Sequence, residues 1–165
     1  MTADDLIMTI LRNSDLTSEL RDAEIEALAS IMTVHDYKAG EFLLRPGDNR
    51  LEKTLMILGT GEVEATAAIK GEKATLHLLQ PGDIAGIITF VGGDATQISA
   101  TVQVKQDSKV ILLERSRFES LMNTNPAIVY YVMRGIVRHV HGIVRRMNMQ
   151  SVEMTNYIHR TGGRY

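Results

Sequence analysis

Five histidines are the side chains of this 165-residue chain best suited to bind a metal ion or to exchange protons near neutral pH. The two closest in sequence, His139 and His141, are two residues apart in a helical region, so they point about 200° away from each other and cannot bind one ion. The chain has no cysteine, which excludes disulfides, zinc–thiolate sites, iron–sulfur clusters and cysteine nucleophiles. The motifs of serine hydrolases, phosphate-binding loops and zinc proteases are also absent. We therefore expect no catalytic residue, no metal site and no cofactor.

The composition is that of a single globular domain. Hydrophobic residues make up 44% of the chain and charged residues 23%, which is close to the average for soluble domains. No apolar run approaches the roughly 18 residues that suggest a transmembrane helix. The N-terminus has two aspartates and no basic segment before an apolar stretch, so it does not resemble a secretory signal. Together with the absence of cysteine, this predicts a cytoplasmic protein that does not associate with membranes.

The charge is distributed unevenly along the chain. Residues 1–125 contain 12 Lys and Arg and 19 Asp and Glu, a net charge of −7, whereas residues 126–165 contain six Arg and one Glu, a net charge of +5. A basic segment of this kind can bind nucleic acid or an acidic partner. A solvated helix face explains it equally simply, and we favour that interpretation. Nucleic acid is therefore not an expected partner.

Residues 1–36 and residues 37–114 have different patterns. In the first segment, apolar residues at helical spacing predict a short helix behind Asp4 and Asp5 and a second helix over about residues 18–33. In the second segment, short apolar runs are separated by Gly, Pro and Asp, which is typical of an all-β barrel or sandwich. Two Pro-Gly-Asp tripeptides, at 46–48 and 81–83, have the chemistry of type II turns and predict equivalent corners of a rolled sheet.

Residues 115–160 are predicted to be helical again, first as a short helix and then as a long helix that starts at Pro126 and runs to about Ile158; residues 161–165 form a tail. The long helix has apolar residues that alternate three and four apart, as in a coiled coil. We therefore predict a homodimer in which the long helices pair. The predicted dimer seam consists of Met133, Ile136, Val140, Ile143 and Met147.

Five segments in this order resemble one known family. They are YKAGEFLLRPGD (37–48), LMILGTGEVE (55–64), LLQPGDIAG (78–86), ISATV (98–102) and VILLERSRFESLMNTNP (110–126). The chain resembles the cyclic-nucleotide-binding domain family, in its bacterial catabolite-activator/FNR-like branch. The resemblance implies a mainly β fold with flanking helices, namely a double-stranded β-helix (jelly roll), and a long C-terminal dimerisation helix.

The resemblance also implies a ligand site, and this chain departs from it. In the family, a short helix after the second Pro-Gly-Asp turn offers its backbone amides to the cyclic phosphate, a Glu binds the ribose hydroxyl and an Arg binds the phosphate. Gly86 matches the start of this cassette, but Ile87 stands at the Glu position and Ile98 at the Arg position. Between Gly86 and Val102 the only ionisable side chain is that of Asp94.

The loss of both polar groups indicates an apolar pocket and not a pocket that contains an unpaired charge. Loss of one alone would leave a buried charge without its partner, which is costly, whereas loss of both leaves an apolar pocket that is empty, filled or repurposed. We therefore predict that cyclic AMP and cyclic GMP do not bind in the usual way, and the identity of any small ligand stays open. By resemblance, the pocket positions are Gly86, Ile87, Ile88, Ile98, Ser99, Ala100 and Thr101.

Bacterial regulators of this branch usually continue into a helix-turn-helix domain, for which the residues after the long helix are too few. We therefore predict a non-catalytic regulatory or signalling module that acts as a homodimer through a protein partner or an atypical ligand. The alternative is a small-ligand or nucleotide sensor related to Crp/Fnr-type transcriptional regulators.

Overall fold

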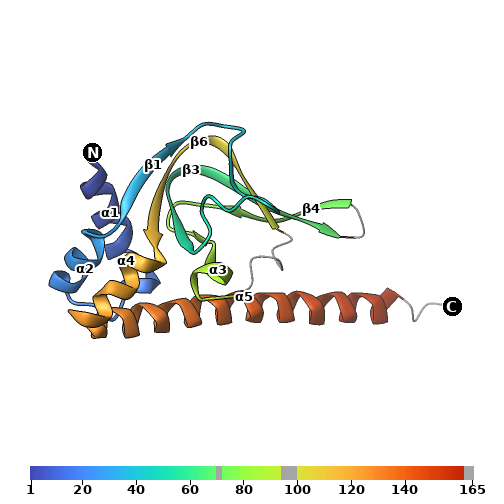
Figure 1. Cartoon of the computed structure of the whole chain (residues 1–165). Coiled ribbons are helices and arrows are strands. Elements are labelled where there is room, and N and C mark those ends of the chain that lie inside the picture. Colours follow the sequence, from blue (N-terminus) through green and yellow to red (C-terminus); the bar gives the residue numbers. More distant parts are fainter. Residues whose placement is uncertain (70–71, 94–99, 162–165) are drawn as a thin grey trace.

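A computed structural model describes residues 1–69, 72–93 and 100–161 of the chain (Figure 1). The middle of the chain forms a rolled β-sheet, and helices from both ends of the chain close one side of it (Figure 1). The helical elements are α1 (Ala3–Arg12), η1 (Asp15–Thr17), α2 (Asp22–Ala29), α3 (Ile87–Phe90), α4 (Arg115–Ser120), η3 (Leu121–Asn123) and α5 (Pro126–Thr161). The strands are β1 (Thr33–Tyr37), β2 (Phe42–Leu44), β3 (Thr54–Ile69), β4 (Glu72–Leu79), β5 (Ile84–Ala85) and β6 (Ala100–Glu114).

The sheet is antiparallel and is built around two long strands. The order β1-β6-β3-β4 forms its main path, while β2 pairs with β6 and β5 pairs with β3. Register shifts interrupt the pairing of β3 with β6, and such bulges increase the local bend of a strand. Gly47 and Gly82 have φ angles of 81° and 94°, as the turn chemistry of the two Pro-Gly-Asp corners predicts. The predicted mainly β jelly roll with flanking helices is therefore confirmed.

Two clusters of buried side chains stabilise the molecule. One lies inside the roll and includes Met56, Val63 and Val104. The other, which we call the helical core, joins the helices of both chain ends to one side of the sheet. Its buried members are Ile7, Leu11, Leu16, Ile25, Leu28, Met32, Leu55, Ile57, Phe90, Ile111, Leu113, Phe118, Leu121, Ile128, Val132 and Ile136.

The N-terminal boundary between helix and sheet differs from the prediction. The helix expected over residues 18–33 is α2, which ends at Ala29 with Ser30 as its C-cap, and the sheet starts at Thr33 instead of residue 37. Thr33 and Val34 are β-branched and pair with Leu112 and Ile111 of β6. Pairing with a long neighbouring strand therefore outweighs the helical spacing of the apolar residues that precede it.

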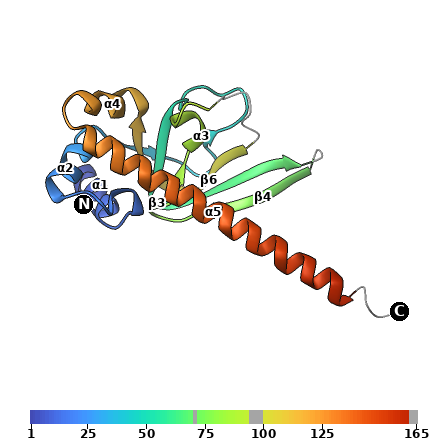
Figure 2. The same ribbon diagram turned by 90° about the horizontal axis from the view of Figure 1, so that it is seen from below.

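Helix α5 is attached to the N-terminal segment by a close contact and by an ion-pair cluster. A Cβ atom on Gly135 would lie 2.7 Å from the Cα of Leu16, so the absence of a side chain allows α5 to approach η1 closely. The carboxylate of Glu19 binds Arg134 at 3.1 Å and Arg138 at 2.7 Å. Figure 2, seen from below, shows α5 starting beside the N-terminal helices, passing in front of the roll and continuing beyond it. Although α5 has 36 residues, neither it nor any other helix in the described part of the chain is long and apolar enough to span a membrane.

The predicted dimer seam on α5 has to be corrected at one position. Ile136 is only 2% exposed because it belongs to the helical core of its own subunit, and it is therefore not available to a partner. Met133 and Ile143 are half-buried, whereas Val140 and Met147 are exposed. A second row with the same alternating spacing of three and four residues faces outward, and we call it the outer stripe. Its apolar members are Val137, Val140, Val144, Met147, Met154 and Ile158.

Two glycines seven residues apart on α5 provide a matched test of the contact with η1. Replacement of a helical glycine by alanine ordinarily stabilises a helix by about 1 kcal/mol. We expect Gly142→Ala to do so, because its Cβ would meet nothing closer than Arg146 Nη1 at 3.9 Å. We expect Gly135→Ala to lower the free energy of unfolding by about 1–3 kcal/mol through overpacking. Urea unfolding measures both, and a Gly135→Ala variant as stable as Gly142→Ala would contradict the close contact.

Candidate ligand-binding site

The second Pro-Gly-Asp turn and the short strand β5 determine where α3 begins. Ala85 and Ile84 of β5 pair with Met56 and Ile57 of β3, which brings the start of α3 beside the first residues of β3. Gly86 then has a φ of 81°, and a Cβ at this position would lie 2.5 Å from the carbonyl oxygen of Thr54. Both the backbone conformation and the available space therefore require glycine at the first position of the predicted cassette.

The side chains of α3 are mostly apolar and pack toward the helices. Ile87, at the position where the resemblance implies Glu, is half-buried and packs against the helical core. Phe90 is only 2% exposed, and its ring lies 5.4 Å from that of Phe118. Ile88 is 55% exposed. Helix α3 is therefore attached to the helical core, and it carries no charged side chain that would bind a ligand.

The strand half of the predicted cassette is described only in part. Ala100 and Thr101 are half-buried at the start of β6, where they pair with Ala67 and Thr66. Ile98 and Ser99 lie outside the described residues. Residues 86–88 lie beside the first residues of β3, whereas Thr101 pairs with Thr66 near the end of β3. The described contacts therefore do not join the helix half of the predicted pocket to its strand half.

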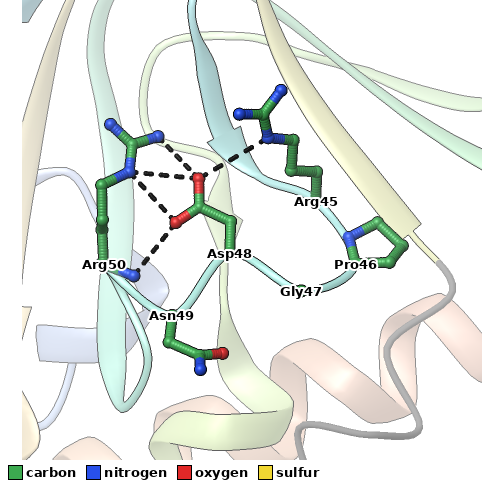
Figure 3. A pocket seen from close by; sticks show the side chains of 6 residues that line it. All are labelled: Arg45, Pro46, Gly47, Asp48, Asn49 and Arg50. Carbon is green, nitrogen blue, oxygen red and sulfur yellow. Dashed lines mark hydrogen bonds and ion pairs between the residues drawn. The ribbon is translucent and has the colours of Figure 1, made fainter.

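The described residues do form a polar cavity at the other Pro-Gly-Asp corner, which the sequence analysis did not assign to a site. Residues 45–50, which we call the cationic loop, line an open cavity of about 760 Å³ (Figure 3). The two arginines flank Asp48 from opposite sides. Arg50 binds its carboxylate through Nε at 3.0 Å and Nη2 at 2.7 Å, and the Nε of Arg45 lies 3.8 Å from it. The segment RPGDNR carries the available signal, since only this Pro-Gly-Asp tripeptide has arginines on both sides.

Hydrogen bonds keep Asp48 ionised. The side chain and the backbone N–H of Arg50 donate to the carboxylate and, with the nearby Arg45 charge, lower the pKa of Asp48 from 3.8 to about 2. The cationic loop therefore contains two positive charges and one negative charge at any pH above about 4. Among the described residues, no cluster of three or more His, Asp or Glu side chains could hold a metal ion.

With this fold and this site, the chain matches the cyclic nucleotide-binding domain family over residues 34–125, which is more than half of its length. The chain therefore belongs to the cyclic nucleotide-binding domain family. Solved structures have similar folds. A cyclic nucleotide-binding domain from Methylobacillus flagellatus KT has a TM-score of 0.78 and 20% identity, over 92% of this chain and 83% of that chain.

Two further relatives connect the domain to larger proteins. The Thermus thermophilus catabolite activator protein has a TM-score of 0.67 and 22% identity, over 84% of this chain and 63% of its own. The mouse patatin-like phospholipase domain-containing protein 6 is 23% identical over 154 residues, which is 91% of this chain and 11% of that protein. The chain thus spans about a tenth of the length of this curated relative.

The pKa of Asp48 tests the geometry of the cationic loop. The native pKa lies below the ordinary value, so the ion pair with Arg50 should persist above about pH 4 and be lost as the pH falls through about 2. Carbon-detected NMR should find the carboxyl titrating near 2, and Arg50→Gln should move the pKa back toward 3.8. Arg45→Gln should move it less, because that nitrogen is 3.8 Å away. An ordinary pKa in the unmutated protein would contradict the arrangement in Figure 3.

Proposed function

We propose that the chain is a non-catalytic regulatory domain that does not bind cyclic AMP or cyclic GMP in the usual mode of its family. The observation that carries the proposal is Ile87, which stands at the cassette position expected for Glu and packs against the helical core. The sequence adds Ile98 at the expected Arg position. A regulatory role fits the family, and the phospholipase activity in the name of the mouse relative belongs to a protein of which this chain matches 11%.

The magnitude of the loss supports the proposal. A hydrogen bond to a charged group contributes about 1.5–3 kcal/mol. Loss of an arginine–phosphate contact and a carboxylate–ribose contact would remove roughly 4 kcal/mol or more, which is about three decades of affinity. Isoleucine side chains would also desolvate the phosphate without offering a compensating charge.

The alternative is a sensor that binds a nucleotide through other contacts. Arg134 and Arg138 of α5 do not support it, because both bind Glu19. The cationic loop does support it, because Arg45 shares a small cavity with Thr89 of α3. The two proposals differ in whether the domain binds a cyclic nucleotide and in which arginine would bind its phosphate.

Calorimetry with cyclic AMP and cyclic GMP at millimolar concentration separates these proposals. We expect no binding by the unmutated protein, and measurable binding by the double variant Ile87→Glu plus Ile98→Arg. A matched control is Ile88→Glu plus Ile98→Arg, since Ile88 is exposed on α3 and should not restore the ribose contact. Micromolar affinity of the unmutated protein for either cyclic nucleotide would refute the proposal.

We also propose that two copies of the chain pair along α5. The outer stripe supports this, because Val137, Val144 and Met147 are 65%, 46% and 60% exposed at heptad spacing. Full burial of each apolar side chain contributes about 1.5–3 kcal/mol, so several on each helix offset the cost of association. Ile136, which the sequence placed in the seam, remains in the core of each subunit.

Two single aspartate substitutions test the pairing of α5. Val144→Asp places a charge on the outer stripe, and Asn156→Asp places one on the opposite side of the same helix. We expect the first to raise the dissociation constant of the dimer by about a hundredfold or more, since it removes apolar burial and adds a buried charge, and the second to leave it nearly unchanged. Sedimentation equilibrium measures both. A monomeric unmutated protein at micromolar concentration, or equal effects of the two variants, would disprove the pairing.

A further inference from the structure

We infer that the cationic loop and Thr89 form a binding site for the phosphate group of a phosphate monoester, with Arg45 as its main cation. The open cavity of about 760 Å³ is lined by residues 45–50, and it shares five of these residues, 45–49, with an inner cavity of about 20 Å³. The inner cavity is also lined by Thr89 of α3. The site thus joins the β2–β3 turn to the helix of the family's cassette through contacts that do not involve Ile87.

Arg45 is positioned to bind a ligand from outside the loop. Its guanidinium carbon lies over the Phe42 ring, 4.9 Å from the ring centre, which is a cation–π contact. Such a contact does not use the N–H groups as hydrogen-bond donors, and the donors of an arginine match the geometry of a phosphate. Its ion pair with Asp48 involves only Nε, at 3.8 Å. Neither terminal amino group of Arg45 donates a hydrogen bond to a residue in the described ranges.

The charges around the cavity favour an anion at Arg45 more than at Arg50. Arg50 is engaged with both carboxylate oxygens of Asp48 and with the carbonyl oxygen of Phe42, so its charge is largely compensated. The charge of Arg45 is compensated much less. Glu52 also lines the inner cavity and opposes an anion there. Removal of the Glu52 charge should therefore increase the affinity of the site for an anion.

Thr89 supplies the independent indication of a ligand. The residue is only 3% exposed, and its Oγ1 is the one buried side-chain oxygen or nitrogen without a hydrogen-bond partner among the residues that the structure describes. A buried hydroxyl without a partner is costly. Thr89 lines the adjoining cavity of about 20 Å³, which has room for one oxygen atom. The outer cavity is within the size range of small-molecule sites, so it has room for the rest of the ligand.

This inference deepens the alternative proposed above, a sensor that binds a nucleotide through other contacts, and it does not depend on the absence of cyclic nucleotides from the cassette. The proposed function concerns cyclic diesters at the cassette, which carry one negative charge. A phosphate monoester carries nearly two at neutral pH and gains more from an arginine. The experiment therefore uses three probes, namely adenosine 5′-monophosphate, inorganic phosphate and cyclic AMP. Calorimetry at low ionic strength is suitable, because salt screens exposed charges.

We expect adenosine 5′-monophosphate to bind the unmutated protein, and cyclic AMP at the same concentration to give no measurable binding. Inorganic phosphate competes with the monophosphate if the site recognises the phosphate group alone. Arg45→Gln should lower the affinity about tenfold or more, and Thr89→Val about threefold to tenfold. Glu52→Gln should raise the affinity, which a loss of folding cannot mimic.

Arg117→Gln is the matched control. The side chains of Arg117 and Arg45 are 51% and 54% exposed, and each forms one ion pair at 3.8 Å, with Glu114 and Asp48 respectively. Arg117 lies on α4, outside the cavity. Its replacement should leave the affinity unchanged. Absence of binding at millimolar monophosphate, equal losses in Arg45→Gln and Arg117→Gln, or weaker binding by Glu52→Gln would each overturn the inference. None of these results bears on the absence of cyclic-nucleotide binding at Ile87.

Discussion

The close contact between Gly135 of α5 and the backbone of Leu16 joins the two ends of the chain on one side of the roll. Because Leu16 and Ile136 belong to the same cluster, this contact holds the N-terminal helices, α4 and α5 around a common helical core. The ion pairs of Glu19 with Arg134 and Arg138 lie beside it and fix the rotation of α5 about its axis. That rotation buries Ile136 and exposes Val137, and it therefore determines which side of the helix is available to a partner.

The same core holds the helix of the family's ligand cassette. Phe90 belongs to the helical core and Ile87 packs against it, so α3 is connected to α5 through apolar packing. Ile87, at the position where the resemblance implies Glu, adds to this packing. Charged side chains lie on the β2–β3 turn, where Arg45 and Arg50 flank Asp48. The domain thus has the architecture of its family, and we propose that its polar contacts to a ligand have changed.

The sequence predicted the elements well where one pattern dominated and less well where two patterns overlapped. Turn residues at 46–48 and 81–83 and the proline at the start of α5 have one interpretation each, and the structure agrees with them. On α5, spacings of three and four residues can be followed from Ile136 or from Val137 equally well. Only the position of η1, which is distant in sequence, decides between the two rows. The small cavity beside the cationic loop was missed for a related reason, because it is also lined by Thr89, which lies 40 positions after Asn49 in the chain.

We propose that this cyclic nucleotide-binding domain works as a dimer without a cyclic nucleotide in its cassette. A native mass spectrum of freshly purified protein tests it most directly, because one measurement reports both the assembly and any retained small molecule. The account predicts a species of twice 18.3 kDa with no added mass of cyclic AMP or cyclic GMP. A monomer, or a dimer that retains one cyclic nucleotide per subunit, would contradict it.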